Sequence, residues 1–369
     1  MKKKILAYIE DPRFGGPHQF TINLFDQLKE EFDFSFLISN KENNFFLKKI
    51  KKNKIKFYIM PISILSLNLN YILRYIFFFI PEILQLKKFI KKKNFDIIYA
   101  TSGLYSIKVI LAAAMLNKKI VVHFHDAYCN YFFLSLSNLF KKFIDSFFFS
   151  SKKSYNFYKS YLDNGNFTIV QSGIYVKKKI NFKKKTQNSY NILTVANINP
   201  IKNFEFLIEV AHSLKNIKNI NFTVIGKVWR SQEKYFNKIN NLKNKYKLKN
   251  IKFIINSNKD LINRYTNNSD IYLCTSKNES SPMSIWESMS AGKPIISTNV
   301  GDLNIFKKKY KFGFIIDICS INLFKKKILE LYKNNNMQYK MGRQAYLFAK
   351  NELNIVTISK KIKKIFLKL

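Results

Sequence analysis

One stretch of the sequence decides the fold: Thr275-Ser-Lys-Asn-Glu-Ser-Ser-Pro-Met-Ser-Ile-Trp-Glu-Ser-Met-Ser-Ala-Gly-Lys-Pro-Ile-Ile-Ser297. It predicts a strand that ends at Thr275, a loop, a helix over Pro282 to Ser290, and a second strand over Pro294 to Ser297. Gly292 lies where the helix must stop. A strand, a helix and a strand in this order make one unit of a parallel α/β sheet.

The loop before that helix carries polar groups. Ser281 is predicted to cap the helix and Pro282 to occupy its first turn, so the loop ends on backbone amides at the positive end of the helix dipole. Such a helix start suits a diphosphate. Glu279 lies in the loop and Glu287 lies eight residues later, inside the helix. Taken alone, the two carboxylates also fit partners of the helix dipole and ordinary surface charge.

Strand and helix patterns alternate along the whole chain. This alternation predicts two Rossmann-like α/β domains with parallel sheets that face each other across a cleft. The first domain is expected over residues 1–175, a polar linker over 176–190 and the second domain over 191–345. A C-terminal helix over 346–369 can cross back to the first domain.

The patterns assign the elements as follows. In the first half they predict strands at 4–9, 34–38, 57–60, 96–100 and 120–124, and helices at 19–28, 72–92 and 105–116. In the second half they predict strands at 191–195, 221–225, 251–255, 271–275 and 294–297. The helices there are expected at 203–214, 231–246, 259–266 and 282–290, with a helical region from 321.

Glu279 and Glu287 form an E-x-x-x-x-x-x-x-E pattern that Ser-Met-Ser-Ala-Gly-Lys-Pro-Ile-Ile follows. This pattern resembles the donor-site signature of glycosyltransferase family 4, which has the GT-B fold. The segment Asn191 to Ala211 is similar to the one that opens the C-terminal domain of that family. Shorter segments resemble the family too, strongly in the second half and more loosely in the first: Val224–Gly226, Asn268–Leu273, Val300–Asp302, Phe14–His18, Val122–Asp126 and Ile169–Ile174.

The resemblance implies roles for single residues. Glu287 would bind the ribose hydroxyls, because a carboxylate accepts two hydrogen bonds from a cis-diol. Glu279 would face the donor sugar, and Lys202 would neutralise the departing diphosphate together with the helix dipole. His125 matches the histidine that hydrogen-bonds the transferred sugar. Taken without the resemblance, Lys202 fits an ordinary surface lysine, and His125 and His123 fit buried structural histidines.

The same resemblance implies a wider donor site. It places these residues at the nucleotide and the donor sugar: Asn197, Gly226, Lys227, Ser281, Pro282, Met283 and Ser284. Gly15 and Gly16 match a glycine loop after the first strand, although two glycines alone also fit a simple turn. The family usually carries Gly-Arg where this chain has Ala196-Asn197. Lys227 or Arg230 can replace the missing positive charge.

The function that the resemblance implies is that of a retaining, metal-independent hexosyltransferase. It would move a sugar from a nucleotide diphosphate to a hydroxyl of a glycan or lipid-linked glycan, in the synthesis of surface polysaccharide or lipopolysaccharide. The chain has no Asp-x-Asp loop and no convincing cluster of metal ligands, so we expect neither a metal nor a cofactor. Two alternatives stay open: a nucleotide-sugar epimerase or hydrolase of the same fold, and a non-catalytic basic scaffold that binds nucleic acid.

Composition and charge limit the classes of partner that we expect for this chain. The chain has 369 residues and a net charge of +41, but the basic residues are spread evenly, with 29 up to residue 180 and 35 after it. Nucleic-acid binding usually needs a focused patch, so we expect nucleic acid not to be a partner. Solvated surface lysines explain the charge, and anionic lipid or a phosphorylated substrate stays open as an alternative.

Cysteine usage and hydropathy predict a cytoplasmic protein, with a place at the cytoplasmic face of the inner membrane left open. The three cysteines are isolated and odd in number, which fits a reducing compartment. The apolar run after Met1 stops at Glu10, so it predicts a first strand and not a signal peptide. The apolar stretches 69–88 and 130–149 combine aromatic residues with lysines, which fits either core helices or helices that lie on an anionic membrane.

Overall fold

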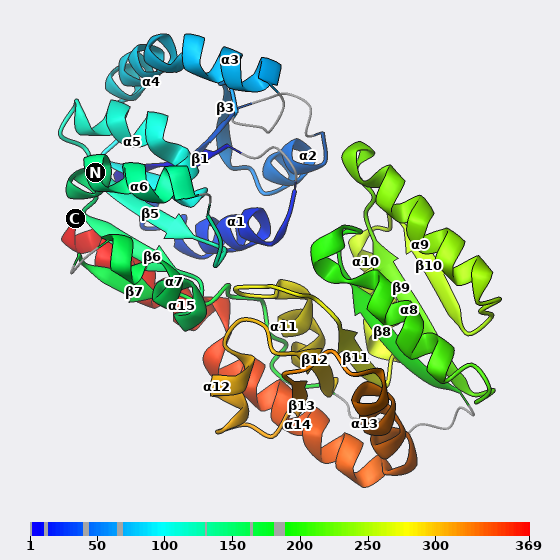
Figure 1. Ribbon diagram of the computed structural model, residues 1–369. Helices are drawn as coiled ribbons and strands as arrows, with labels where there is room; N and C mark the ends of the chain where they lie inside the picture. The colour runs from blue at the N-terminus through cyan, green and yellow to red at the C-terminus, as the bar shows by residue number, and fades with distance from the viewer. Residues whose placement is uncertain are drawn as a thin grey trace. The chain divides into compact units, whose positions relative to one another are not determined.

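The computed structural model describes residues 2–10, 14–39, 44–64, 69–129, 131–162, 165–180 and 189–369. The chain divides into two compact units (Figure 1). The first unit comprises Met1–Tyr175 and Ile355–Leu369, and the second comprises Val176–Asn354. Each unit has one sheet, so the prediction of two α/β domains with parallel sheets is confirmed.

The sheet of the first unit has seven strands in the order β3-β2-β1-β4-β5-β6-β7, and every pairing is parallel. The strands are β1 (Lys3–Ile9), β2 (Phe32–Ile38), β3 (Lys56–Ile59), β4 (Ile97–Ala100), β5 (Lys119–Phe124), β6 (Ser146–Phe149) and β7 (Phe167–Ile169). Strand order reverses between β1 and β4, and loops at such a reversal commonly bind ligands.

Helices connect these strands, because a parallel pair needs a crossover. They are α1 (Gly16–Leu28), α2 (Asn44–Lys52), α3 (Leu69–Phe77), α4 (Phe79–Lys93), α5 (Ile107–Ala114), α6 (Tyr131–Phe140) and α7 (Lys152–Leu162), with the short 3-10 helices η1 (Gly103–Ser106) and η2 (Lys141–Phe143). The last helix of the chain, α15 (Ile355–Lys368), also belongs to this unit and packs against α1.

The sheet of the second unit has six parallel strands in the order β10-β9-β8-β11-β12-β13. The strands are β8 (Tyr190–Val195), β9 (Ile220–Gly226), β10 (Ile251–Ile255), β11 (Ile271–Cys274), β12 (Ile295–Thr298) and β13 (Gly313–Ile316). All residues of β11 and β12 are buried, as expected for strands that are covered on both faces. Strand order reverses between β8 and β11.

The helices of the second unit are α8 (Phe204–Ser213), α9 (Glu233–Lys245), α10 (Lys259–Asn268), α11 (Met283–Ser290), α12 (Leu303–Lys307), α13 (Ile321–Lys333) and α14 (Asn335–Glu352). Two 3-10 turns, η3 (Pro200–Lys202) and η4 (Arg230–Gln232), precede α8 and α9. The apolar faces of α8, α9 and α13 join the core of this unit.

Several details differ from the sequence expectations. Helix α1 begins at Gly16 and not at residue 19, because Pro17 fits a first helical turn. The stretch 130–149 is not all helical: its end is the buried strand β6. Helix α14 continues past residue 345 to Glu352, and the units divide at Ile355. Of the expected linker, residues 181–188 lie outside the described residues, as does Asn130.

Candidate functional site

Lys202 and Glu279 meet where the strand order of the second unit reverses. Lys202 ends the 3-10 turn that follows β8, and Glu279 lies in the loop that follows β11. The two side chains form an ion pair, and each is only 19% exposed. The Ser276 hydroxyl also donates to Glu279 Oε1 at 2.9 Å. The two central loops of the sheet therefore bring opposite charges together at one point.

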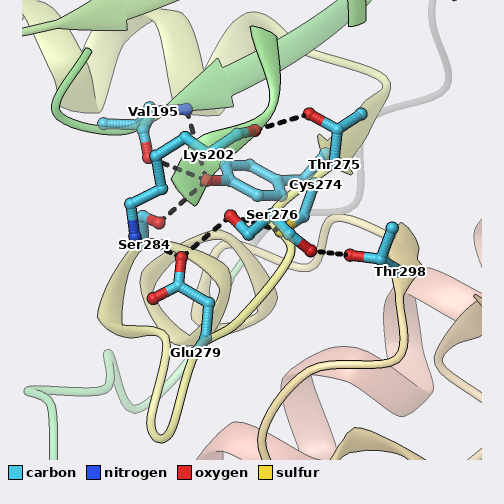
Figure 2. Close-up of polar contacts among 9 residues, drawn as sticks. Val195, Lys202, Cys274, Thr275, Ser276, Glu279, Ser284 and Thr298 are labelled. Carbon is cyan, nitrogen blue, oxygen red and sulfur yellow. Dashed lines mark hydrogen bonds and ion pairs between the residues drawn. The ribbon is translucent and has the colours of Figure 1, made fainter. Parts of the chain in front are cut away.

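Hydrogen bonds between the loops fix this arrangement (Figure 2). The Thr275 hydroxyl donates to the backbone oxygen of Lys202 at 3.0 Å, so the loop after β11 holds the turn that carries the lysine. The Thr298 hydroxyl, at the end of β12, donates to the backbone oxygen of Ser276 at 2.6 Å. Three strand ends are thus linked, and Lys202 and Glu279 have little freedom to separate by backbone motion.

Helix α11 begins beside this pair. Its N-cap is Pro282, and no side chain caps it. The prediction that Ser281 is the N-cap is wrong: the Ser281 hydroxyl accepts a hydrogen bond from the indole N–H of Trp286 at 2.9 Å instead. Since no side chain occupies the cap, the amides of the first turn, including those of Met283 and Ser284, can meet an anionic ligand.

Ser284 is hydrogen-bonded to a tyrosine of the neighbouring strand β11. Its hydroxyl is hydrogen-bonded to the Tyr272 hydroxyl at 2.8 Å, and that hydroxyl also donates to the backbone oxygen of Val195 at 2.9 Å. Tyr272 is buried, and burial raises its pKa well above the usual range, so it stays protonated. These bonds fix the start of α11 relative to the end of β8.

Gly226 ends β9 at a very close approach of two loops. A Cβ at this position would lie 2.3 Å from the backbone oxygen of Ala196, so no larger residue fits without a shift. The backbone N–H of Ile198 donates to the oxygen of Lys227 at 2.9 Å. Asn197, which stands where the family has arginine, is half-buried between these two contacts.

Lys227 is the nearest lysine along the chain to Gly226. Its Nζ lies 3.8 Å from the centre of the Trp229 ring, and partial desolvation lowers its pKa. Arg230, the other residue considered as a substitute for the missing arginine, is exposed in η4. Lys227 therefore has the more enclosed position of the two.

Glu287 lies in the middle of α11 and has a partner that the sequence did not suggest. Lys259, the first residue of α10, places its Nζ 2.5 Å from Glu287 Oε1. The Glu287 side chain is 32% exposed, so it remains open to solvent on one side. A ribose that binds Glu287 would have to share that carboxylate with Lys259 or displace it.

Three buried acceptor or hydroxyl atoms around these loops have no hydrogen-bond partner among the residues that the structure describes: Asn199 Oδ1, Asn278 Oδ1 and Ser257 Oγ. Each residue follows the end of a strand, namely β8, β11 and β10. Buried polar atoms are normally hydrogen-bonded, so unpaired atoms at three strand ends indicate a place for a polar ligand. Sequence reasoning missed all three, because only their position after a strand could have pointed to them.

His125 follows β5 in the first unit, directly beside His123. The centres of the two rings are 3.8 Å apart, and Phe20 of α1 packs edge-on against both. Within the described part of the chain, the Nδ1 and Nε2 atoms of His125 are buried without a hydrogen-bond partner, whereas His123 Nδ1 is 2.5 Å from the Tyr99 hydroxyl. Burial, with a smaller effect of the nearby His18, lowers the pKa of His125 to about 3. His125 is therefore neutral at pH 7 and free to bond a ligand hydroxyl.

Gly15 and Gly16 lie between β1 and the start of α1. The backbone N–H of Gly15 donates to His18 Nδ1 at 3.2 Å, and a Cβ at Gly15 would meet no atom closer than 3.8 Å. Since Phe20 of the same helix packs on His125, the glycine segment and the histidine share one region of the first unit.

A basic hollow lies at the opposite edge of the second sheet. It has a volume of about 580 Å³ and is lined by His212, Lys215, Lys218, Lys245, Lys247 and Lys249, among others. These residues lie in the last turns of α8 and α9 or directly after them, where positive charge complements the negative end of a helix dipole. We do not assign the site there, because ligands of parallel sheets bind at the carboxyl ends of the strands. Among the described residues, no three His, Cys, Asp or Glu side chains group as metal ligands.

Comparisons with known proteins identify a family model and proteins that the chain resembles. Residues 176–348 match the family model described as Glycosyl transferases group 1. A stretch of 165 residues is 28% identical to the uncharacterised glycosyltransferase MJ1178 of Methanocaldococcus jannaschii, and this match covers 44% of each chain. The matched stretch thus spans less than half of that relative.

Two solved structures are similar over the whole length. The crystal structure of HepE from Anabaena in complex with UDP and glucose has a TM-score of 0.83 at 16% identity, with 100% of both chains covered. A glycosyltransferase from Rickettsia africae has a TM-score of 0.81 at 19% identity, with 100% of this chain and 98% of the other covered. The chain has the GT-B fold of these glycosyltransferase structures.

Proposed function

We propose that this protein is a glycosyltransferase that takes its sugar from a nucleoside diphosphate donor bound in the second unit. The observation that carries the proposal is the meeting of Lys202 and Glu279 beside the uncapped start of α11. The match of the second unit to a glycosyltransferase family and the UDP held by a protein of the same fold support it.

In this proposal Lys202 is the group that stabilises the diphosphate as it leaves. The free amides at the start of α11 add a second favourable interaction with the same negative charge. Lys227 compensates for Asn197, since its ammonium is partly desolvated and therefore interacts more strongly with an anion. The diphosphate charge is met by these groups without a metal or a cofactor.

Glu287 would accept hydrogen bonds from the two ribose hydroxyls, and Gly226 would keep the two neighbouring loops close to the nucleotide. Glu279 has two tasks in this scheme: it orients Lys202 in the free protein, and it faces the donor sugar when the diphosphate binds the lysine. Its bond from Ser276 holds the carboxylate in place during that exchange.

The first unit would supply the acceptor side. His125 is neutral and has two buried, unpaired ring nitrogens, so it can hydrogen-bond a sugar hydroxyl. Gly15 and Gly16 would allow a ligand to approach the backbone at the start of α1. We propose a hexosyl transfer with retention of configuration to a hydroxyl of a glycan or lipid-linked glycan, in surface polysaccharide or lipopolysaccharide synthesis at the cytoplasmic face of the inner membrane. None of the three cysteines forms a disulfide with another described residue, as a reducing compartment favours.

The test is a turnover assay with the purified full chain. UDP, GDP and ADP sugars are offered with and without a membrane glycolipid extract, and nucleotide release and the anomer of the product are measured. We expect acceptor-dependent release from one donor, retention of configuration, equal activity in EDTA, and loss of activity in Lys202→Met. Release that does not need an acceptor would overturn the transferase assignment in favour of a hydrolase, and a changed free sugar nucleotide would favour an epimerase.

A further inference from the structure

Helices α3 and α4 carry a large exposed apolar surface, which we call the α3–α4 ridge. Phe77 is 76% exposed, and Ile76 is 66% exposed. The ridge consists of Leu69, Leu73, Ile76, Phe77, Ile80 and Leu84, and every member is more than half exposed. A contiguous apolar surface of this kind usually marks a site of interaction.

The opposite face of the two helices is firmly held. Ile83, Leu86 and Ile90 of α4 are buried in the core of the first unit. Glu82 forms a buried ion pair with Lys108 at 2.6 Å, and Lys108 Nζ lies 3.7 Å from the centre of the Tyr75 ring of α3. The helices are therefore anchored on their inner face, and the ridge is exposed because it points away from the core.

Positive charge lies beside the ridge. Arg74 is exposed in α3, and α4 ends with five lysines between residues 87 and 93, of which Lys88, Lys91, Lys92 and Lys93 are exposed. Glu82 is the one acidic residue between residues 69 and 94, and its charge is already paired with Lys108. The outer face of the helices thus combines apolar side chains with uncompensated positive charge.

We propose that the α3–α4 ridge docks on the surface of an anionic lipid bilayer, with the apolar side chains among the acyl chains and the lysines at the headgroups. Apolar area and attraction to anionic lipid are the two contributions that hold an amphipathic helix at a membrane interface. The proposal does not depend on the reaction that the protein catalyses.

Two other occupants fit the ridge less well. A second copy of this chain that bound symmetrically would bring a second set of uncompensated positive charges to the same interface, and like charges repel. A membrane span also fits poorly. No single helix in the described residues is long and apolar enough to cross a membrane, although α3 and α4 together, bent by 55°, pass by length and composition. In the structure, however, the inner face of α4 is packed into protein.

The experiment is flotation of the full chain with vesicles of phosphatidylcholine alone and with vesicles that also contain phosphatidylglycerol. The test variants are Ile76→Gln/Phe77→Gln for the ridge and Lys88→Gln/Lys91→Gln/Lys92→Gln for the charge. The matched controls change exposed residues of the same kinds in the second unit: Ile305→Gln/Ile318→Gln, and Lys218→Gln/Lys245→Gln/Lys249→Gln. Thermal melting verifies that each variant is folded, and light scattering gives its oligomeric state.

We expect the wild-type chain to float with the anionic vesicles, less so at high salt, and each test variant to lose at least about tenfold in partitioning while the controls keep theirs. Three results would overturn the proposal. They are no flotation of the wild-type chain with anionic vesicles, equal losses in test and control variants, and a wild-type dimer that Ile76→Gln/Phe77→Gln converts to a monomer.

Discussion

Replacing Lys202 with methionine separates the two tasks of the Lys202–Glu279 pair. In the free protein the change leaves Glu279 with the Ser276 hydroxyl alone, although 81% of the glutamate side chain is shielded from solvent. In the complex with a nucleoside diphosphate, the substitution removes the ammonium group that, in our proposal, binds the phosphates. The first effect concerns stability and the second concerns affinity, so the two can be measured independently.

The size of each effect follows from the environment of the pair. Breaking a fully buried ion pair costs roughly 3–5 kcal/mol, so the remaining exposure of this pair reduces the expected loss in unfolding free energy to about 2 kcal/mol. A charge-assisted hydrogen bond is worth roughly 1.5–3 kcal/mol, which is about a tenfold to hundredfold change in affinity. Because the phosphate must take Lys202 from Glu279, we expect the lower end, about tenfold.

Urea unfolding and isothermal titration with UDP give the two numbers for wild type, Lys202→Met, Glu279→Gln and the double variant. We expect the double variant to regain most of the lost stability but not the affinity, because it removes the unpaired charge without restoring the cation. Glu279→Gln alone should bind UDP severalfold more tightly, since it frees Lys202. If folded Lys202→Met protein bound UDP as tightly as wild type, Lys202 would not be the cation that binds the phosphates.

Three more perturbations test other parts of the account. Glu287→Ala should weaken UDP binding about tenfold or more in calorimetry, because it removes the acceptors for the ribose, whereas Lys259→Met should not; equal effects would contradict the ribose role. Gly226→Ala should lower the unfolding free energy by roughly 1–3 kcal/mol because its Cβ would lie 2.3 Å from a carbonyl oxygen, while Gly15→Ala should be neutral in the same urea titration. The pKa of His125 is about 3 in the folded chain and near 6.5 in the unfolded chain. The contribution of His125 to the unfolding free energy is therefore present above about pH 6.5 and is lost by about 1.4 kcal/mol per pH unit as the pH falls toward 3. His125→Gln should flatten this dependence of the unfolding free energy on pH, and an unchanged slope would contradict the expected low pKa.

The sequence predicted the sheets well because their strands are short apolar runs set between helical patterns. All ten expected strands are present, with ends that shift by one or two residues. Six α-helices and strands were not predicted: α2, β6, α7 and β7 in the first unit, and α12 and β13 in the second. Strand β6 was predicted as part of a helix. Phe147, Phe148 and Phe149 are all buried, and a run of phenylalanines shows neither the alternation of a half-buried strand nor the period of an amphipathic helix.

The sequence predicted individual residues of the candidate site but not the contacts between residues that lie far apart in the chain. Lys202 and Glu279 were both identified, but their pairing joins residues that lie 77 positions apart, and no local pattern contains it. The Lys259–Glu287 pair was missed for the same reason. Ser281 was expected to cap α11, because serine before proline suits that position, but the buried Trp286 indole needs an acceptor and takes its hydroxyl. Tertiary hydrogen bonding thus decided a local feature.

The donor site that we propose lies in the second unit, where a nucleoside diphosphate would bind at the carboxyl ends of β8 and β11. The most direct test is the melting temperature of the full chain in the presence of UDP, GDP or ADP. A ligand at a hundred times its dissociation constant adds about 2.7 kcal/mol, which should raise the melting temperature of a unit of this size by about 5–10 °C. We expect such a rise with at least one nucleotide, and we expect Glu287→Ala to abolish it. No rise with any of the three, together with tight salt-dependent binding of nucleic acid, would contradict the proposed donor site.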